Sequence, residues 1–214
     1  MKLAQGSGSW VLIWFFICVF LFFVYGFVNG TTGFFILALF ILSVIIECFF
    51  LVFFRDPKRN IGKGIVAVAD GVIRDISELY DEDVGESLCI STFMNIYHVH
   101  VNRMPLDGTI QQMDHINGGH LPAFQKESKR NERMISLIDT EYGPMKIIQI
   151  AGTLARRIVN YHRPGIQLKK GQRYGIIRLG SRVDLIVSKI QIKTINVKKG
   201  DHVRAGESQI ISMQ

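Results

Sequence analysis

Two long apolar stretches near the N-terminus constrain this chain more than any other feature. Residues 10–28 and 34–54 each approach the roughly 20 apolar residues that a helix needs to cross a bilayer. A short turn rich in Asn, Gly and Thr separates them. Of the 15 Phe residues, only Phe93 and Phe124 lie elsewhere. A cleaved signal peptide has a shorter apolar region and no second span, so residues 1–54 are predicted to form a transmembrane helical hairpin.

The charges around the hairpin predict its orientation. Basic residues lie on both flanks: Lys2 before the first span, and Arg55, Lys58, Arg59 and Lys63 after the second. Basic flanks tend to stay in the cytoplasm, so residues 55–214 are expected on the cytoplasmic side of the cell membrane. Glu47 is the one charged residue within the spans. A carboxylate in hydrocarbon is costly, so it should be protonated, paired or near an interface.

Charge and cysteine usage narrow the function classes. The net charge of +7 belongs wholly to residues 55–214, because residues 1–54 contain one Lys and one Glu. A basic domain tethered to a membrane is attracted to anionic head groups. Nucleic acid is not the expected partner, because no basic run has interleaved aromatics. Three cysteines in a chain of this length exclude a disulfide scaffold and fit a reducing compartment.

The pattern after the hairpin is that of short strands punctuated by Gly and Asp. The expected strands are Ile65–Ala69, Val72–Ile76, Leu88–Phe93, Tyr97–Val101, Lys146–Ile150, Tyr174–Leu179, Val183–Val187, Ile190–Val197 and Gln209–Ser212. Thr153–Val159 continues a strand or is helical, Gly118–Pro122 is expected as loop, and Ala123–Arg133 as a short helix or loop. The predicted fold class is therefore a two-helix transmembrane hairpin followed by one mostly-β, β-rich α+β domain.

One weak internal similarity is present in this domain. Val197–Glu207 and Gly64–Val72 share an apolar–turn–apolar form. The arrangement resembles the hairpins of lipoyl- and biotinyl-type barrel sandwiches, although two unrelated β-turns explain it equally well. It also supports an alternative function, a membrane-anchored adaptor or carrier domain without catalysis. The turn contains Lys-Gly-Asp rather than the lysine-centred turn that a modified carrier needs.

Taken as bare residues, few motifs indicate chemistry. There is no phosphate-binding glycine loop, nucleophile elbow or CxxC pair. His98 and His100 would share a face if their segment is a strand, but no Cys or acidic cluster completes a zinc site, so no metal is predicted. A Gly-Ser step at Gly180 and Ser181 lies between two apolar runs and, alone, is compatible with a simple turn.

Several ordered motifs change that interpretation. The segment Gly175-Ile-Ile-Arg-Leu-Gly-Ser-Arg-Val-Asp184 resembles the self-cleavage motif of phosphatidylserine decarboxylases, in their short archaeal-type branch. Other stretches resemble that family in the same order: Phe53-Phe-Arg-Asp-Pro57, Val68-Ala-Asp-Gly71, Tyr97-His-Val-His-Val-Asn-Arg-Met-Pro105, Asn131-Glu-Arg133, and Gln149-Ile-Ala-Gly152 with Ala155-Arg-Arg157. The resemblance covers essentially the whole chain.

The resemblance implies a proenzyme that makes its own cofactor. Cleavage would fall between Gly180 and Ser181, giving a β chain of residues 1–180 and an α chain of residues 181–214. The Ser181 hydroxyl would attack the Gly180 carbonyl, and elimination from the resulting ester would leave dehydroalanine. Hydrolysis would then give ammonia and an N-terminal pyruvoyl group, which forms a Schiff base with the substrate amine. This electron sink replaces PLP, and no metal is needed.

The family's other functional residues map less uniformly. Its cleavage uses an Asp–His–Ser arrangement, and Asp70 matches the Asp. Longer members have two His before the Met-Pro step. Counting back from Met104, the first falls on His100 but the second on Arg103. His100 is the first candidate for catalysis, and the cleavage base stays open among His98, His100 and His120. Arg156 and Arg157 are candidates for the lipid phosphate, or form a solvated pair.

The predicted function is decarboxylation of a serine phospholipid at the cytoplasmic face, with an ethanolamine phospholipid such as phosphatidylethanolamine as product. The substrate is phosphatidylserine or, in an archaeal source, archaetidylserine. A membrane anchor confines the active site to the plane that holds the substrate. A serine hydrolase using Ser181 is a third hypothesis, with no triad to support it. The sequence leaves the oligomeric state open and is compatible with a homodimer.

Overall fold

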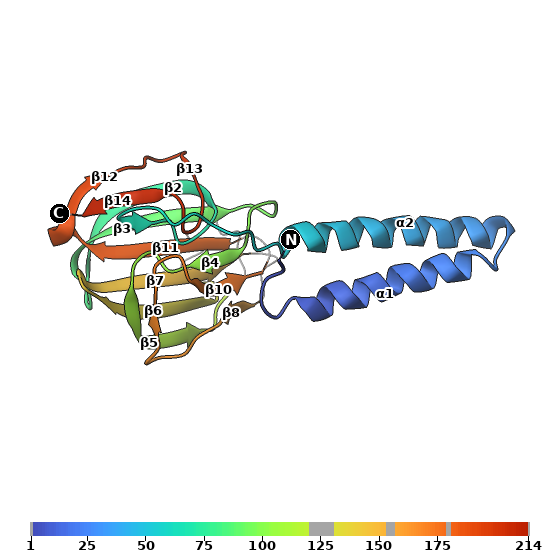
Figure 1. Cartoon of the computed structure of the whole chain (residues 1–214), viewed down its shortest axis with the longest axis horizontal. Helices are drawn as coiled ribbons and strands as arrows, with labels where there is room; N and C mark the ends of the chain where they lie inside the picture. Colours follow the sequence, from blue (N-terminus) through green and yellow to red (C-terminus); the bar gives the residue numbers. More distant parts are fainter. Residues whose placement is uncertain (1, 120–130, 153–156, 179–180, 214) are drawn as a thin grey trace. The chain divides into compact units, whose positions relative to one another are not determined.

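The computed structural model describes residues 2–119, 131–152, 157–178 and 181–213. Its contacts divide the chain into two compact units, Met1–Pro57 and Lys58–Gln214 (Figure 1). The first unit contains the helices and the second contains the strands.

The first unit is a pair of antiparallel helices, α1 (Gly8–Tyr25) and α2 (Gly30–Phe53), of 18 and 24 residues. At 1.5 Å per residue they are about 27 and 36 Å long, which suits a hydrocarbon core of about 30 Å. In the described part of the chain, these two helices are long and apolar enough to cross a membrane. Aromatic side chains hold them together, including Trp14 with Phe50 at 6.0 Å and Phe22 with Phe40 at 5.6 Å between ring centroids.

Backbone hydrogen bonds join the two ends of this hairpin. The Ala4 N–H donates to the Phe54 carbonyl at 2.8 Å, and the Asp56 N–H donates to the Lys2 carbonyl at 2.8 Å. The segment before α1 and the segment after α2 are therefore neighbours. This places both flanks of the hairpin at the same end of the helix pair.

The second unit is built almost entirely of strands. An eight-stranded antiparallel sheet has the order β13-β2-β3-β11-β7-β6-β5-β9. Its strands are β2 (Gly71–Asp81), β3 (Gly85–Met94), β5 (Gly108–Ile116), β6 (Arg133–Thr140), β7 (Gly143–Ala151), β9 (Gln167–Leu168), β11 (Ser181–Ser188) and β13 (His202–Val203). Two three-stranded sheets complete the unit. They contain β1 (Ile65–Val66), β14 (Gln209–Met213) and β12 (Ile192–Ile195), and β4 (Val101–Arg103), β10 (Arg173–Ile177) and β8 (Ile158–Asn160).

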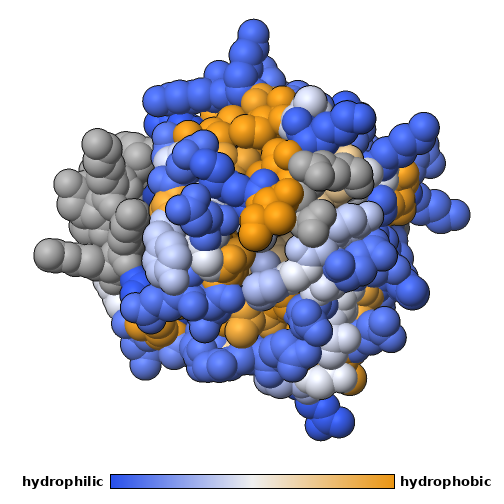
Figure 2. Space-filling view, turned by 90° about the vertical axis from the view of Figure 1, so that its left-hand side faces the viewer, coloured by the Kyte–Doolittle hydropathy of each residue, from blue (hydrophilic) through white to orange (hydrophobic). Residues whose placement is uncertain are grey.

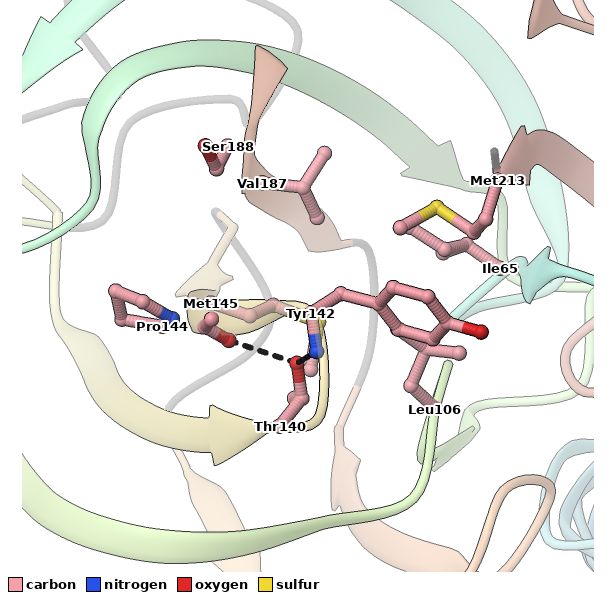
Figure 3. A pocket seen from close by; sticks show the side chains of 10 residues that line it. Ile65, Leu106, Thr140, Tyr142, Pro144, Met145, Val187, Ser188 and Met213 are labelled. Carbon is pink, nitrogen blue, oxygen red and sulfur yellow. Dashed lines mark hydrogen bonds between the residues drawn. The ribbon is translucent and has the colours of Figure 1, made fainter. Parts of the chain in front are cut away.

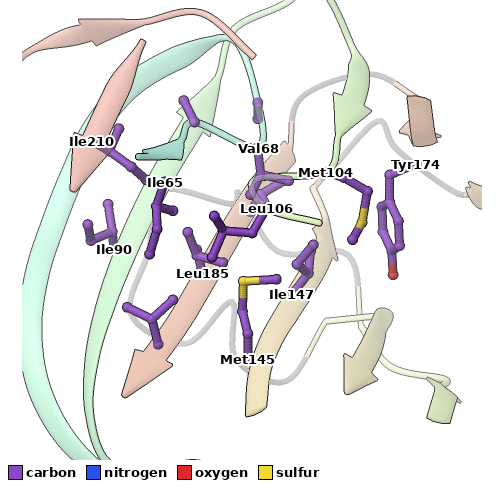
Figure 4. Close-up of a cluster of buried hydrophobic side chains, with 14 of the residues drawn as sticks. Ile65, Val68, Ile90, Met104, Leu106, Met145, Ile147, Tyr174, Leu185 and Ile210 are labelled. Atoms are coloured by element: carbon purple, nitrogen blue, oxygen red, sulfur yellow. The ribbon is translucent and has the colours of Figure 1, made fainter. Parts of the chain in front are cut away.

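The core lies on one face of the large sheet, which curls around it (Figures 1 and 4). Along β11 the side chains of Val183, Leu185 and Val187 point into this core, as the two-residue period of a strand requires. Tyr174 of β10 is fully buried there, and its hydroxyl donates to Ser136 Oγ. Burial raises the pKa of Tyr174 to about 12. The architecture confirms the predicted fold class of an apolar helical hairpin and a β-rich domain.

The two segments with similar turns lie against each other. The Gly206 N–H donates to the Ala67 carbonyl at 2.8 Å, and the Gly200 N–H donates to the Ile73 carbonyl at 2.8 Å. Strand β13 also pairs with the start of β2, with Val203 opposite Gly71. A Cβ on Gly71 would lie only 2.2 Å from the Phe93 carbonyl oxygen, so glycine is required where β2 approaches β3.

Several expected elements differ from the structure. Residues 95–100 are not a strand, and β4 begins at Val101, so His98 and His100 do not share a strand face. Strands β5 and β6 were not predicted, because Gln111 and Gln112 interrupt the alternation of β5 at a bulge and Ser136 divides the short apolar run of β6. β8 begins at Ile158, and residues 153–156 lie outside the described part. Most of Ala123–Arg133 and of Gly118–Pro122 lies outside it as well.

Candidate functional site

The antiparallel register brings separated motifs to one end of the large sheet. β11 starts at Ser181, which pairs with Met94 at the end of β3 and with Ala151 at the end of β7. β2 starts at the same end with Gly71, since the following residue, Val72, pairs with Phe93. The end of one strand therefore lies beside the start of the next. Motifs from across the chain converge on the first residue of β11.

Ser181 is fully buried, on the same face of β11 as the core residues. Its hydroxyl donates to the thioether sulfur of Met94 at 3.4 Å. A thioether is a weak hydrogen-bond acceptor. The hydroxyl is therefore positioned without being strongly engaged, which suits a group that must act as a nucleophile.

Two buried amides extend the polar site around Ser181. Gln149 Nε2 donates to Asn102 Oδ1 at 2.8 Å, and Asn102 Nδ2 donates to the same Met94 sulfur at 3.8 Å. Both amide residues are fully buried. The Gln149 Oε1 atom has no hydrogen-bond partner among the described residues. An unsatisfied buried polar atom is costly and commonly marks a functional site, so this oxygen is a second candidate contact for a ligand beside Ser181.

Asn131 fixes the end of β7 opposite Ser181. Its Nδ2 donates to the Ala151 carbonyl at 2.8 Å, and the Ala151 N–H donates to the Glu132 carbonyl at 2.9 Å. The Asn131-Glu-Arg133 motif thus supports the strand that flanks Ser181. The Arg182 and Asp184 side chains form an ion pair at 2.6 Å. They alternate with Ser181 and Val183, so they belong to the opposite face of the sheet.

Asp70 is engaged by two groups. Its carboxylate accepts two hydrogen bonds from Arg59 Nη2, at 2.9 and 2.7 Å, and one from the Ala205 N–H at 2.8 Å. Arg59 Nη1 also donates to Glu207 at 3.3 Å. No histidine in the described ranges is a hydrogen-bond partner of Asp70. In the sequence, Arg59 is recognisable only as part of the basic flank of the hairpin, and no spacing indicates its contact with Asp70.

The two candidate histidines occupy different surroundings. His100 is fully buried just before β4, with Nδ1 2.9 Å from the His98 carbonyl oxygen. His98 is half-buried, and its Nδ1 accepts the Asn95 N–H at 3.0 Å. The His98 ring centroid lies 6.4 Å from that of His202 on β13. His98 is therefore close to the strand that pairs with Gly71, whereas His100 is enclosed by the domain.

Two arginines lie beside each other just beyond the ends of β8 and β10. Arg178 N–H donates to the Arg157 carbonyl at 3.3 Å, one residue beyond the pairing of Ile177 with Ile158. Burial lowers the pKa of Arg178, and the nearby charge of Arg157 lowers it further. A bound anion would offset the repulsion between these two charges.

The described residues do not include every predicted site residue. Gly180, Arg156 and His120 lie outside them. The structure brings Ser181 together with Met94, Asn102 and Gln149. It also places Arg178, which was not predicted as a site residue, beside Arg157. Asn102 and Gln149 lie inside motifs that were recognised in the sequence, but nothing in the spacing indicated that they would meet. Groups of three or more His, Cys, Asp or Glu suited to a metal ion are absent from the described part.

A separate pocket lies at the other end of β11 (Figure 3). It is lined by residues from strand ends and turns: Ile65, Leu106, Thr140, Tyr142, Gly143, Pro144, Met145, Val187, Ser188 and Met213. The face at this end of the domain is largely hydrophilic around a limited apolar area (Figure 2). At about 3.3 Å per residue, Ser188 lies roughly 20 Å along the strand from Ser181. The pocket is therefore distinct from the candidate site.

Comparisons with known proteins agree on one family. The family model described as "Phosphatidylserine decarboxylase" matches residues 46–211. A "Phosphatidylserine decarboxylase proenzyme" of Thermobifida fusca is 45% identical over 159 residues, which cover 74% of this chain and 70% of the relative. A "Putative archaetidylserine decarboxylase proenzyme" of Methanosarcina barkeri is 41% identical over 176 residues, 81% of each chain. One with the same description from Methanococcoides burtonii is 41% identical over 175 residues, 80% of this chain and 79% of the relative.

The buried amide pair yields a stability prediction. Asn102→Leu should lower the free energy of unfolding by about 1–3 kcal/mol, because it leaves Gln149 Nε2 buried without its acceptor. Thermal unfolding of the full chain in detergent, followed by circular dichroism, measures this effect. Asn196→Leu is the control, since Asn196 is exposed and bonds to Ser212 at the surface. Equal effects of the two substitutions would contradict the prediction.

Proposed function

This chain belongs to the phosphatidylserine decarboxylase family of carboxy-lyases, and we propose that it decarboxylates a serine phospholipid through a pyruvoyl group derived from its own Ser181. The observation that carries the proposal is the position of Ser181, buried at the first residue of β11 with a weakly bound hydroxyl. The names of the relatives point to phosphatidylserine or its archaeal ether-lipid counterpart as substrate. The product is the corresponding ethanolamine phospholipid.

Self-cleavage starts with the Ser181 hydroxyl. Its oxygen attacks the Gly180 carbonyl carbon, and the peptide bond is replaced by an ester while the Ser181 nitrogen gains a proton. In the elimination that follows, a base removes the Ser181 Cα proton as the Cβ–O bond breaks, which releases Gly180 as a carboxylate and leaves dehydroalanine. Water converts this to ammonia and the pyruvoyl group. Attack needs a base and stabilisation of the developing oxyanion. The buried amides of Asn102 and Gln149, which connect to Ser181 through the Met94 sulfur, can orient this step.

We assign the remaining roles by geometry and family motif. Asp70 is held rigidly at the same sheet end by Arg59 and Ala205, and we propose that it supports cleavage. His100, buried beside β4, is proposed to act in decarboxylation, and His98 is the second candidate for the cleavage base. The residues around Ser181 fit a small carbonyl group, because they offer amide donors and exclude water. When formed, that group withdraws the electron pair left by CO₂.

The Arg157 and Arg178 pair is proposed to bind the substrate phosphate. Arg178 is three residues from Ser181 in sequence, and guanidinium groups match phosphate oxygens bidentately. A phosphodiester bound by both guanidinium groups would offset the repulsion between their charges. The amine and carboxylate of a serine head group would then extend toward Ser181.

The same proposal includes the membrane anchor and the division of the chain. We propose that residues 1–54 span the membrane twice, and that residues 55–214 are the catalytic domain on the cytoplasmic side, cleaved into chains 1–180 and 181–214. The backbone bonds that join the two flanks of the hairpin support one side for both, and the basic flank after α2 supports the cytoplasmic side.

Ser181→Ala tests the mechanism. The variant should remain one chain of 24.3 kDa with no decarboxylase activity, because it lacks the nucleophile and the cofactor precursor. Intact-mass measurement of the purified wild type should show two chains, the smaller one with a blocked N-terminus. Release of CO₂ from phosphatidylserine by the variant would contradict the mechanism. His98→Ala and His100→Ala, scored separately for cleavage and for turnover, assign the two steps.

Arg178→Gln tests the phosphate site. We expect the KM for the phospholipid to rise about tenfold or more, with a smaller change in kcat, because the interaction binds substrate rather than the reacting bond. Arg178→Lys should restore little, since a lysine cannot make the bidentate contact. Kinetics are measured on the cleaved enzyme in mixed micelles. Lys193→Gln removes an exposed charge on β12 and serves as control. An unchanged KM for Arg178→Gln would refute the assignment.

Protease protection tests the orientation. In sealed right-side-out vesicles, residues 55–214 should be protected from added trypsin, and in inverted vesicles they should be digested. The reason is that the basic flanks keep both ends of the hairpin in the cytoplasm. A cytoplasmic marker protein trapped in the vesicles controls for leakage. Digestion in right-side-out vesicles would place the domain on the other side.

A further inference from the structure

Arg59 forms a compact ionic cluster that joins parts of the chain distant in sequence. Its guanidinium contacts Asp70 at 2.7 Å and Glu207 at 3.3 Å. The Ala205 N–H donates a further hydrogen bond to the Asp70 carboxylate. We call Arg59, Asp70, Ala205 and Glu207 the Arg59 clasp. Only 6% of the Arg59 side chain and 11% of the Asp70 side chain are exposed, so this is a buried ion pair rather than a surface one.

The backbone around the clasp is also tightly held. The Gly62 N–H donates to the Gly206 carbonyl at 3.0 Å, and the Asn60 N–H donates to Glu207 Oε1 at 3.4 Å. A Cβ on Gly62 would lie 2.2 Å from the Glu207 carbonyl oxygen. The segment that contains Arg59 therefore packs directly on the 205–207 turn.

The clasp joins residues that precede the proposed cleavage site in the sequence to residues that follow it. Arg59 and Asp70 precede Gly180, whereas Ala205 and Glu207 follow Ser181. Asp70 also lies directly before Gly71, where β2 starts at the same sheet end as Ser181. A displacement of the Asp70 carboxylate would therefore affect the start of β2, at the end of the sheet where cleavage is proposed.

We infer that Arg59 is a positioning residue for self-cleavage: it fixes the Asp70 carboxylate and the 205–207 turn in the precursor, so that the sheet end carrying Ser181 is preorganised. This inference rests on the proposed function, since it concerns the same cleavage. Among the described residues, the Arg59 guanidinium donates to Asp70 and Glu207 rather than to Ser181, so Arg59 acts through Asp70. Removing one partner of a buried ion pair leaves the other charge uncompensated. Loss of Arg59 should therefore strongly disturb the Asp70 carboxylate.

The experiment follows cleavage of the newly made full chain over time. The precursor is synthesised in a cell-free system with lipid nanodiscs, and its conversion to two chains is followed by gel electrophoresis. Arg59→Ala should slow cleavage by about tenfold or more. Arg59→Lys should be intermediate, because a lysine keeps the charge but loses the bidentate contact. Arg204→Ala is the matched control: Arg204 also contacts Glu207, at 3.7 Å, but its side chain is 73% exposed.

Chemical rescue separates positioning from a general folding defect. Millimolar methylguanidinium should accelerate cleavage of Arg59→Ala several-fold, whereas equal sodium chloride should not, and the cleavage rate of Arg204→Ala should not respond. Thermal unfolding of each variant in the Ser181→Ala background monitors the fold. Cleavage of Arg59→Ala at the wild-type rate would overturn the inference. The inference would also be overturned if cleavage were slow, were not rescued by methylguanidinium, and were explained by a lowered unfolding temperature.

The same experiment keeps the two proposals apart. A wild-type chain that stays intact would overturn the pyruvoyl mechanism itself. A wild-type chain that cleaves, together with an Arg59→Ala chain that cleaves equally fast, would overturn the role of Arg59 alone.

Discussion

The register of β11 between β3 and β7 is the constraint on which the rest of the catalytic domain depends. Ser181, Val183, Leu185 and Val187 share the core face, while Arg182 and Asp184 lie on the other. A shift by one residue would reverse every side chain. It would bury the two charges in the apolar core and turn Ser181 outward. The alternation in this short segment thus fixes both the sheet and the position of the candidate nucleophile.

The polar groups around Ser181 are a local departure from an otherwise apolar interior. Asn102 and Gln149 are fully buried, and the interaction that links them to Ser181 passes through a methionine sulfur. Such a site gains little hydrogen-bond energy compared with an apolar core of the same shape. Proteins keep arrangements of this kind where function requires them. The Arg157 and Arg178 pair is a second such departure, because the charge of Arg157 lowers the pKa of the neighbouring Arg178.

The sequence predicted the elements whose pattern is local. The hairpin follows from apolar length, and β3, β7, β10 and β11 follow from continuous apolar runs with nearby turns. β5 and β6 could not be recognised in the same way, since a bulge with Gln111 and Gln112 interrupts the alternation of β5 and Ser136 divides the short apolar run of β6. The segment with His98 and His100 has the composition of a strand, yet it forms a turn that leads into β4. The partners of Ser181 and Asp70 depend on long-range register, which no spacing along the chain reveals.

The proposed cleavage site is compatible with a stable product because of where it falls in the sheet. The bond between Gly180 and Ser181 lies at the start of β11, so its loss removes no residue from the ladders with β3 and β7. After cleavage, residues 181–213 would still contribute a central strand, and β13 and β14 would remain paired with β2 and β1. Backbone hydrogen bonds on both sides of β11 can therefore hold the smaller chain without a covalent link. They would also keep its new N-terminus in the buried site where the pyruvoyl group is needed.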